Sequence, residues 1–217
     1  MFEGFSPETV DFLWGIRLNN NREWFLAHKK DYVDYLYEPI KALGKDLFQP
    51  FIDRPGDLLK VSRIYRDARK HHPLPYKESL WICIRKDVEW WAEHPCLYFE
   101  ITPDGISYGF IWLQPKVQAL KAMRQAIAAQ PRKFQNIVNK AERETGSEIT
   151  AHIYKRPPDK APSKALERFF AWKGYIACTV DEAFSEKTFG PELGIRVREY
   201  LEKLIPLYDF LCQFSQQ

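Results

Sequence analysis

The spacing of apolar residues divides the chain into three stretches with different periods. Up to about residue 51, apolar positions recur every three or four residues, as in helices with one buried face. Between residues 59 and 113, apolar and polar residues alternate, which is typical of strands. After residue 116 the helical period returns. The pattern predicts an α+β fold with N-terminal helices, a central and mostly antiparallel sheet, and C-terminal helices.

The N-terminal helices carry recognisable start and stop signals. Ser6 is expected to cap the first helix and Pro7 to occupy its first turn. Asn19-Asn20 should end it, because asparagine tolerates the left-handed conformation that closes helices. Asn21 should then cap a second helix, which we expect Pro39 to break or kink.

Four segments are expected to be strands, at residues 59–65, 80–85, 97–102 and 106–113. The last two flank Pro103-Asp104-Gly105, which is a strong turn sequence. They should therefore pair as an antiparallel hairpin.

The C-terminal half returns to helices, with a break expected at Pro131 and a stop at Gly146. Residues 156–162 contain three prolines and should form an ordered surface loop rather than a linker. A short helix at 164–172 and a strand at 174–180 follow. Helices then run to the C-terminus, with an interruption expected at Pro206. We predict one domain over residues 1–217.

Composition excludes several classes of protein. Hydrophobic residues make up 45% of the 217 positions, so the chain can bury a core, and the 15% of aromatic residues favours a large core or a ring-lined cleft. Cys83, Cys96, Cys178 and Cys212 are too scattered for a zinc module or a disulfide framework, and we predict buried thiols and no metal. Without an apolar span or a signal peptide, we expect a cytoplasmic protein that does not enter membranes.

The most unusual feature is a cluster of cations between Lys60 and Lys77. Six Lys or Arg residues lie there with a single acidic residue, Asp67, although the net charge of the whole chain is only +3. Arginine donates two parallel hydrogen bonds to phosphate or carboxylate and keeps its charge. The cluster is either an anion-binding site or a structural network in which Arg63 and Arg66 pair with carboxylates such as Glu23 or Asp67.

Other residues could contribute to the same site. Asn20, Asn21 and Trp24 could lie at its rim, although two helix caps and a core tryptophan are the stronger interpretation. His71-His72 could transfer protons, but a solvated loop is the stronger interpretation. The candidate ligand-binding residues are Arg63, Tyr65, Arg66, Asp67, Arg69, Lys77, Asn20, Asn21, Trp24 and Arg124.

Several strings of residues resemble the DUF2461 family. They are Phe2 to Thr9, Asn20 to Phe25, Ser62 to Asp67 and Pro75-Tyr76-Lys77. The resemblance extends to the hairpin at 98–112 and to Arg124 in a predicted helix. The resemblance implies an intracellular α+β domain and carries no established activity. Residues 69–74 depart from the family pattern, and the hairpin has only Gly105 and Gly109 where glycines are usual. If those glycines admit a ligand, the site of this chain is narrower or altered.

Three hypotheses about function follow. The leading one is a cationic, aromatic-lined cleft that binds a small phosphorylated or carboxylated molecule, with or without catalysis. The second is a protein-interaction module that uses exposed aromatic residues such as Trp90-Trp91. The third and weakest is single-stranded nucleic-acid binding, since a pI of about 8.5 is low for that function. No cofactor and no oligomeric state follow from the sequence.

Overall fold

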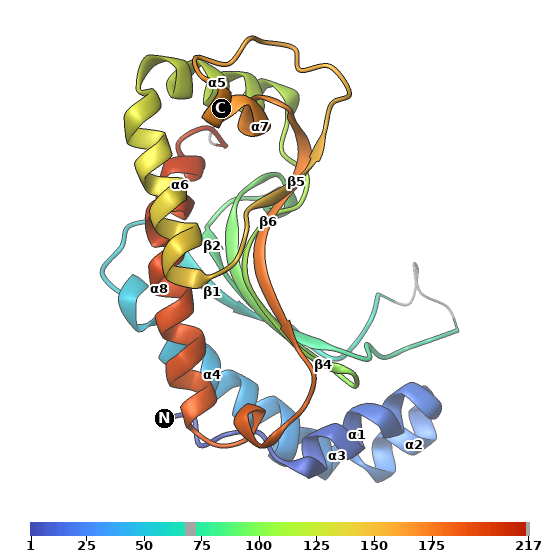
Figure 1. Cartoon of the computed structure of the whole chain (residues 1–217). Coiled ribbons are helices and arrows are strands. Elements are labelled where there is room, and N and C mark those ends of the chain that lie inside the picture. The colour runs from blue at the N-terminus through green and yellow to red at the C-terminus, as the bar shows by residue number, and fades with distance from the viewer. Residues whose placement is uncertain (68–72, 216–217) are drawn as a thin grey trace.

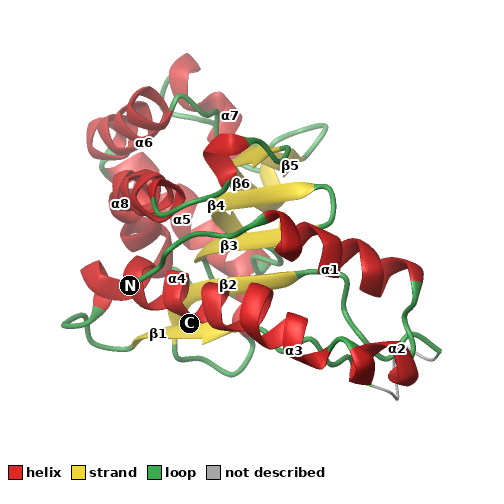
Figure 2. Ribbon diagram, turned by 90° about the horizontal axis from the view of Figure 1, so that it is seen from below, coloured by secondary structure: helices red, strands yellow, loops and turns green. Residues whose placement is uncertain are grey.

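A six-stranded sheet forms the centre of the computed structural model, which describes residues 1–67 and 73–215 (Figure 1). The strands are β1 (Asp57–Val61), β2 (Leu80–Lys86), β3 (Cys96–Thr102), β4 (Gly105–Trp112), β5 (Thr150–Ile153) and β6 (Trp172–Glu182). Their order is β1-β2-β3-β4-β6-β5, and every neighbouring pair is antiparallel (Figure 2). Helices precede and follow the sheet along the chain, so the predicted α+β fold is confirmed.

Helical elements lie at both ends of the chain. The N-terminal set comprises α1 (Pro7–Leu18), α2 (Arg22–Ala27), α3 (Lys29–Asp31), a π-helical segment (Tyr32–Tyr37), α4 (Glu38–Phe48) and a 3-10 turn (Gln49–Phe51). A second 3-10 turn, Trp91–Glu93, precedes β3. The C-terminal set comprises α5 (Val117–Ala129), α6 (Pro131–Thr145), a 3-10 turn (Lys164–Leu166), α7 (Glu167–Phe170), a 3-10 turn (Glu186–Thr188) and α8 (Glu192–Cys212).

The two faces of the sheet differ in what covers them. Helices α4 and α8 pack against one face, where alternate strand residues such as Ile82 and Phe99 are fully buried (Figure 1). Because side chains alternate across a strand, the residues between them point to the other face. Within the described residues no helix packs over the middle of that second face, and the sheet curves around it (Figure 1).

Most of the predicted turn signals are confirmed. The Asn21 side chain accepts a hydrogen bond of 2.9 Å from the backbone N–H of Trp24, as a cap should. Pro131 separates α5 from α6, and Gly146 ends α6 with a left-handed φ of 71°. The turn at Pro103-Asp104-Gly105 joins β3 to β4, whose register pairs Thr102 with Gly105.

Of the break or kink expected at Pro39, the break does not occur. The chain stays helical through the π-helical segment into α4, and Pro39 lies in the first turn of α4. A proline leaves the carbonyl four residues earlier without its usual N–H donor. That carbonyl belongs to Tyr35, and the Thr9 hydroxyl of α1 donates to it at 2.6 Å. A side chain from another helix therefore replaces the missing backbone donor.

The first strand also differs from its prediction, since it covers Asp57–Val61 rather than 59–65. The Ser62 hydroxyl accepts the hydrogen bond of the Trp81 N–H at 2.9 Å, which takes the place of the next backbone carbonyl. Beyond Ser62 the chain leaves the sheet, and an isolated bridge pairs Tyr65 with Tyr76. We call the described residues 62–67 and 73–78 the arm.

Two further differences lie in the C-terminal half. Helix α8 continues through Pro206, because Leu204 and Leu207 on either side are fully buried and their packing outweighs a cost of about 3 kcal/mol. Strand β5 was not predicted, because it is a short edge strand with three exposed residues and an irregular register.

Candidate functional site

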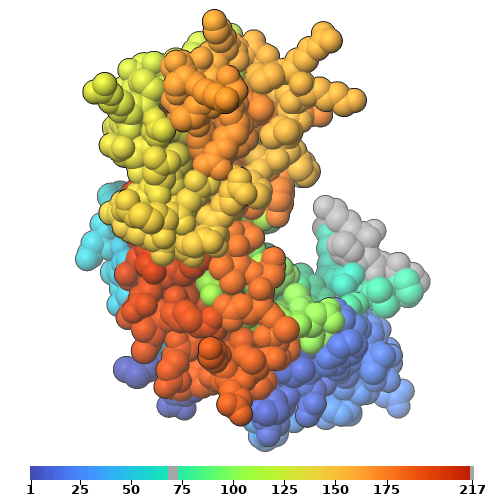
Figure 3. Space-filling view, in the orientation of Figure 1, coloured from blue at the N-terminus to red at the C-terminus, as the bar shows by residue number. Residues whose placement is uncertain are grey.

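A cleft of about 660 Å³ lies on the open face of the sheet. Its floor is made by β2, β3, β4 and β6, and the strand register sets its residues in rows across the sheet. The space-filling view is hollowed on this side, between the orange segment near residues 154–163 and the blue N-terminal helices (Figure 3). The residues that line it are Trp81, Ile82, Cys83, Trp91, Cys96, Tyr98, Glu100, Thr102, Asp104, Gly105, Ile106, Ser107, Ile111, Leu113, Tyr175, Thr179, Asp181, Glu182 and Ala183.

Four aromatic rings line the cleft. Trp81 and Trp91 lie with their ring centroids 6.1 Å apart at one side. Tyr98 lies in the floor, and its hydroxyl shares a hydrogen bond of 2.7 Å with the hydroxyl of Ser107. Tyr175 lies on β6, where the register with β5 is irregular and its own φ is 37°. Such a backbone is rare for a residue with a side chain and turns the ring out of the regular strand pattern.

Burial changes the acidity of the groups in the floor. Burial raises the pKa of Tyr98 to about 12, so its hydroxyl stays protonated at neutral pH. Cys83 and Cys96 are buried side by side, and contact with Cys83 together with burial raises the pKa of the Cys96 thiol. A thiol with a raised pKa is a poor nucleophile. All four cysteines are free and buried, as predicted.

Four carboxylates line the cleft, and two of them are neutralised by arginines. Arg17 of α1 donates to both oxygens of Asp104, at 3.1 and 2.9 Å. Glu182 accepts a hydrogen bond of 2.6 Å from the Tyr108 hydroxyl and forms a close ion pair with Arg196. The other two carboxylates, Glu100 and Asp181, lie directly opposite Ser107 on its two neighbouring strands.

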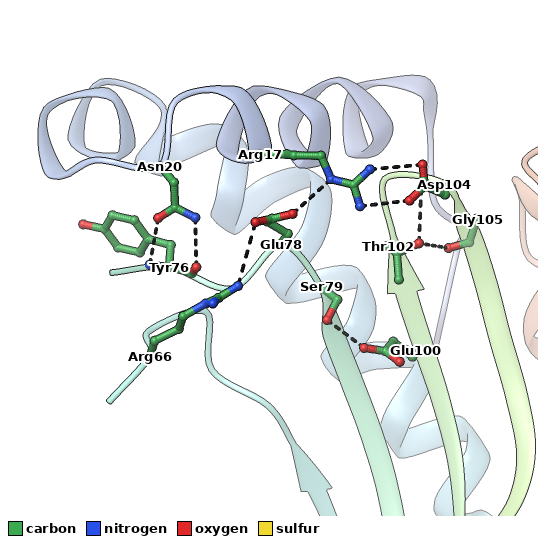
Figure 4. A network of polar contacts seen from close by, with 10 residues as sticks. All are labelled: Arg17, Asn20, Arg66, Tyr76, Glu78, Ser79, Glu100, Thr102, Asp104 and Gly105. Atoms are coloured by element: carbon green, nitrogen blue, oxygen red, sulfur yellow. Dashed lines mark hydrogen bonds and ion pairs between the residues drawn. The ribbon is translucent and has the colours of Figure 1, made fainter. Parts of the chain in front are cut away.

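The arm is tied to the N-terminal helices by a polar network (Figure 4). The Asn20 side chain donates to the Tyr76 carbonyl and accepts from the Tyr76 N–H, both at 3.0 Å. Glu78 pairs with Arg17 at 3.0 Å and with Arg66 at 3.8 Å. The predicted site residues Asn20 and Arg66 are therefore brought together with Glu78 and Arg17, which the sequence analysis did not name.

The other cations of the arm lie in different environments. Arg63 and Tyr65 are exposed, whereas Lys77 is half-buried with its ammonium 5.6 Å from the centre of the Trp81 ring. Burial lowers the pKa of Lys77, and the nearby Arg66 lowers it further. Asp67 is the last described residue of the first segment of the arm. Arg69 and His71-His72 lie outside the described residues.

The remaining predicted residues have structural roles. Asn21 caps α2, and the Trp24 ring stacks on His28 with centroids 4.0 Å apart. Arg124 is buried in α5, where its guanidinium donates to Asp159 at 2.7 Å. Helix α5 lies at the other end of the molecule from α1 and α2, so Arg124 is not brought to the arm (Figure 1).

Comparison with known proteins identifies the family. The family described as "Conserved hypothetical protein (DUF2461)" matches residues 8–210. The chain belongs to the DUF2461 family. A search of curated proteins gave no match to this DUF2461 chain.

The cleft of this DUF2461 protein contains residues that the sequence analysis missed, chiefly Trp81, Tyr98, Glu100 and Asp181. A signal for them exists. In residues 97–102 the apolar positions alternate with Tyr98, Glu100 and Thr102, so these three side chains share the face of the strand opposite the core. Alternation predicts the strand, but whether its second face forms a site depends on the neighbouring strands, which are distant in sequence.

Two further properties bear on what the DUF2461 protein can hold. In the described part of the chain, no group of three or more His, Cys, Asp and Glu residues is arranged to bind a metal ion. None of the described helices combines the length and the hydropathy needed to span a bilayer.

Proposed function

We propose that the cleft on the open sheet face binds a small organic ligand. The observation that carries the proposal is a cavity of about 660 Å³ with four aromatic rings in its lining. This volume lies within the range of roughly 300–1,000 Å³ that ligand sites occupy, and such sites combine apolar and aromatic walls with a few polar groups. Tyr98, Ser107 and Glu100 supply those polar groups here. We propose no reaction.

The rings give a flat ligand surfaces on which to stack. Trp81 enters from β2 and Trp91 from the 3-10 turn before β3, while Tyr98 forms the floor between them and β4. Ring systems contribute attraction beyond the area they bury when they stack or meet edge to face. The ligand class favoured by this lining is therefore one with an aromatic or other planar apolar part.

A matched pair of tryptophans tests this proposal. Trp91 lines the cleft, whereas its neighbour Trp90 does not line it and is 66% exposed. We expect compounds that raise the melting temperature of the protein to do so less in Trp91→Ala, because one wall is lost. Trp90→Ala should respond as the unchanged protein does. The proposal would be contradicted if both variants lost the same part of the rise in melting temperature, or if no compound in a broad panel of planar molecules raised it.

An anionic ligand at the arm is the second candidate. The side-chain Nε of Arg66 is buried and has no hydrogen-bond partner within the described residues. Lys77 lies close enough to Arg66 for the two charges to repel, which adds to the effect of burial on the pKa of Lys77. A phosphate or carboxylate between them would supply the missing acceptor and relieve the repulsion.

Variants of two arginines of the arm test whether an anion binds there. We expect Arg66→Ala to abolish stabilisation by inorganic phosphate or small carboxylates, while Arg63→Ala, which removes an exposed arginine of the same segment, leaves it unchanged. Stabilisation that survives Arg66→Ala would exclude the anion site. A cytoplasmic location and a protein partner stay predictions from the sequence.

A further inference from the structure

The charge of the cleft floor differs from the charge of the arm. Glu100, Ser107 and Asp181 form one row across β3, β4 and β6, because Ser107 is directly opposite each carboxylate residue. Directly opposed residues in antiparallel strands lie about 5 Å apart. The two carboxylates therefore flank the Ser107 hydroxyl, with side chains on the open face of the sheet.

These two carboxylates form no ion pair with the described residues. Asp104 and Glu182 are paired with arginines, but within the described residues neither Glu100 nor Asp181 has a Lys or Arg within 4.0 Å. Glu100 accepts one hydrogen bond of 2.7 Å from the neutral Ser79 hydroxyl, which leaves its second oxygen available. The described lining of the cleft contains no lysine or arginine.

The aromatic rings beside this row also favour a positively charged ligand. Trp81 is directly opposite Glu100, and Tyr98 lies two residues before Glu100 on the same face. The face of an aromatic ring carries negative charge and attracts cations. The ammonium of Lys77, 5.6 Å from the centre of the Trp81 ring, is an example within the protein itself.

We infer that the ligand of the cleft is an organic cation, with an apolar or aromatic part on the rings and a positively charged group over Ser107 between Glu100 and Asp181. This inference rests on the proposed function of the cleft and adds the sign of the ligand's charge. Both carboxylates and the ring faces attract that group from three sides. The arm, with its opposite charge, lies outside this row.

Three probes of the same shape and different charge test the inference. Phenethylamine is a cation at neutral pH, phenethyl alcohol is neutral and phenylacetate is an anion. Binding of each to the full-length protein is followed by NMR, through the indole N–H groups of Trp81 and Trp91 and the amide of Ser107 in the floor. We expect the amine to bind at least about tenfold more tightly than the alcohol, and only its affinity to fall as salt is added.

Variants that remove one charge locate the effect. Asp181→Asn and Glu100→Gln should each lower the affinity for the amine by about tenfold and leave the affinity for the alcohol unchanged. Glu202→Gln, an exposed position on α8 with the same change in net charge, should affect neither. If Glu202→Gln lowered the affinity for the amine as much as the cleft variants do, the effect would come from the net charge of the protein, and the inference would be overturned.

The possible outcomes distinguish the inference of a cationic ligand from the proposal that the cleft binds a ligand. Equal affinities for amine and alcohol, with shifts at the cleft indoles, would overturn the cationic ligand and leave the cleft as a binding site. Tighter binding of phenylacetate would also overturn it and favour the arm. No shift with any probe would count against both.

Discussion

Tyr98 is the polar ring in the floor of the cleft, and burial decides its acidity. Its pKa is raised to about 12 from an ordinary value of 10.0. In the unfolded chain the hydroxyl ionises near the ordinary value, while in the folded protein it stays neutral until a higher pH. The contribution of the Tyr98 hydroxyl to the free energy of unfolding is therefore complete below about pH 10 and is lost as the pH rises toward about 12.

We predict that Tyr98→Phe removes one late step from the alkaline titration followed by tyrosinate absorbance. The free energy of unfolding should also fall less steeply between about pH 10 and pH 12 in this variant, because one proton fewer is released on unfolding. Burial raises the pKa of Tyr108, Tyr200 and Tyr208 as well, so a slope remains. Loss of a step near pH 10, rather than of a late one, would show that Tyr98 ionises at its ordinary pH.

Single residues also show where sequence reasoning stops. The density of cations between residues 60 and 77 was visible, but Glu78, which pairs with Arg66, was left out of the candidate site. The carboxylates Glu100 and Asp181 are 81 positions apart, and only the strand register sets both beside Ser107. The sequence shows which residues are charged, but its local composition does not show which of them lie close together in the fold.

At the scale of elements, the contact between α1 and the π-helical segment replaces a backbone hydrogen bond. The Thr9 hydroxyl donates at 2.6 Å to the Tyr35 carbonyl, whose usual donor is missing because residue 39 is proline. Thr9 is fully buried, so removing its hydroxyl takes a hydrogen-bond donor away from a carbonyl that has already lost its usual one. Such a loss costs about 1–3 kcal/mol.

We predict that Thr9→Val lowers the free energy of unfolding by about 1–3 kcal/mol. Pro39→Ala restores an N–H that can reach the Tyr35 carbonyl, so Thr9→Val should cost less when it is combined with Pro39→Ala. Denaturant unfolding of the two single variants and the double variant gives the coupling between them. Strictly additive costs would mean that the hydroxyl and the missing N–H are unrelated.

Element types were easier to predict than element ends. Alternation and helical periods located the strands of the hairpin and most helices, because these depend on local backbone preferences and one buried face. The ends of β1 and the continuity at Pro39 and Pro206 depend on Ser62, Thr9 and the packing of α8. Those partners are distant in sequence, so local patterns do not contain them.

At the scale of the whole molecule, a buried carboxylate joins the first strand to the last helix. Asp57 of β1 accepts a hydrogen bond of 2.8 Å from the Tyr208 hydroxyl of α8 and pairs at 2.9 Å with Arg54 and with Lys86. The side chain of Asp57 is completely buried. Arg54 has a second, more exposed partner in Asp209.

We predict that Asp57→Ala destabilises the protein by about 3–5 kcal/mol, because it leaves two partly buried cations without their central partner. Asp209→Asn is the matched control in the same network and should cost about 1 kcal/mol or less, since its carboxylate is 44% exposed and Arg54 keeps Asp57. Thermal and denaturant unfolding measure both. Similar costs for the two variants would mean that burial does not set the strength of this link.

The strand order has a consequence for the way the molecule assembles. Strands β1 to β4 follow one another in the sheet as they do in the chain, so each can pair soon after its predecessor. Strand β6 pairs with β4 across an intervening stretch of 59 residues that contains α5, α6, β5 and α7. Because β6 supplies Tyr175, Thr179 and Asp181, the cleft is incomplete until this long loop has closed. A compound bound there would therefore report on the closure of this loop during folding, and the nascent chain would have no complete binding site until β6 had been synthesised.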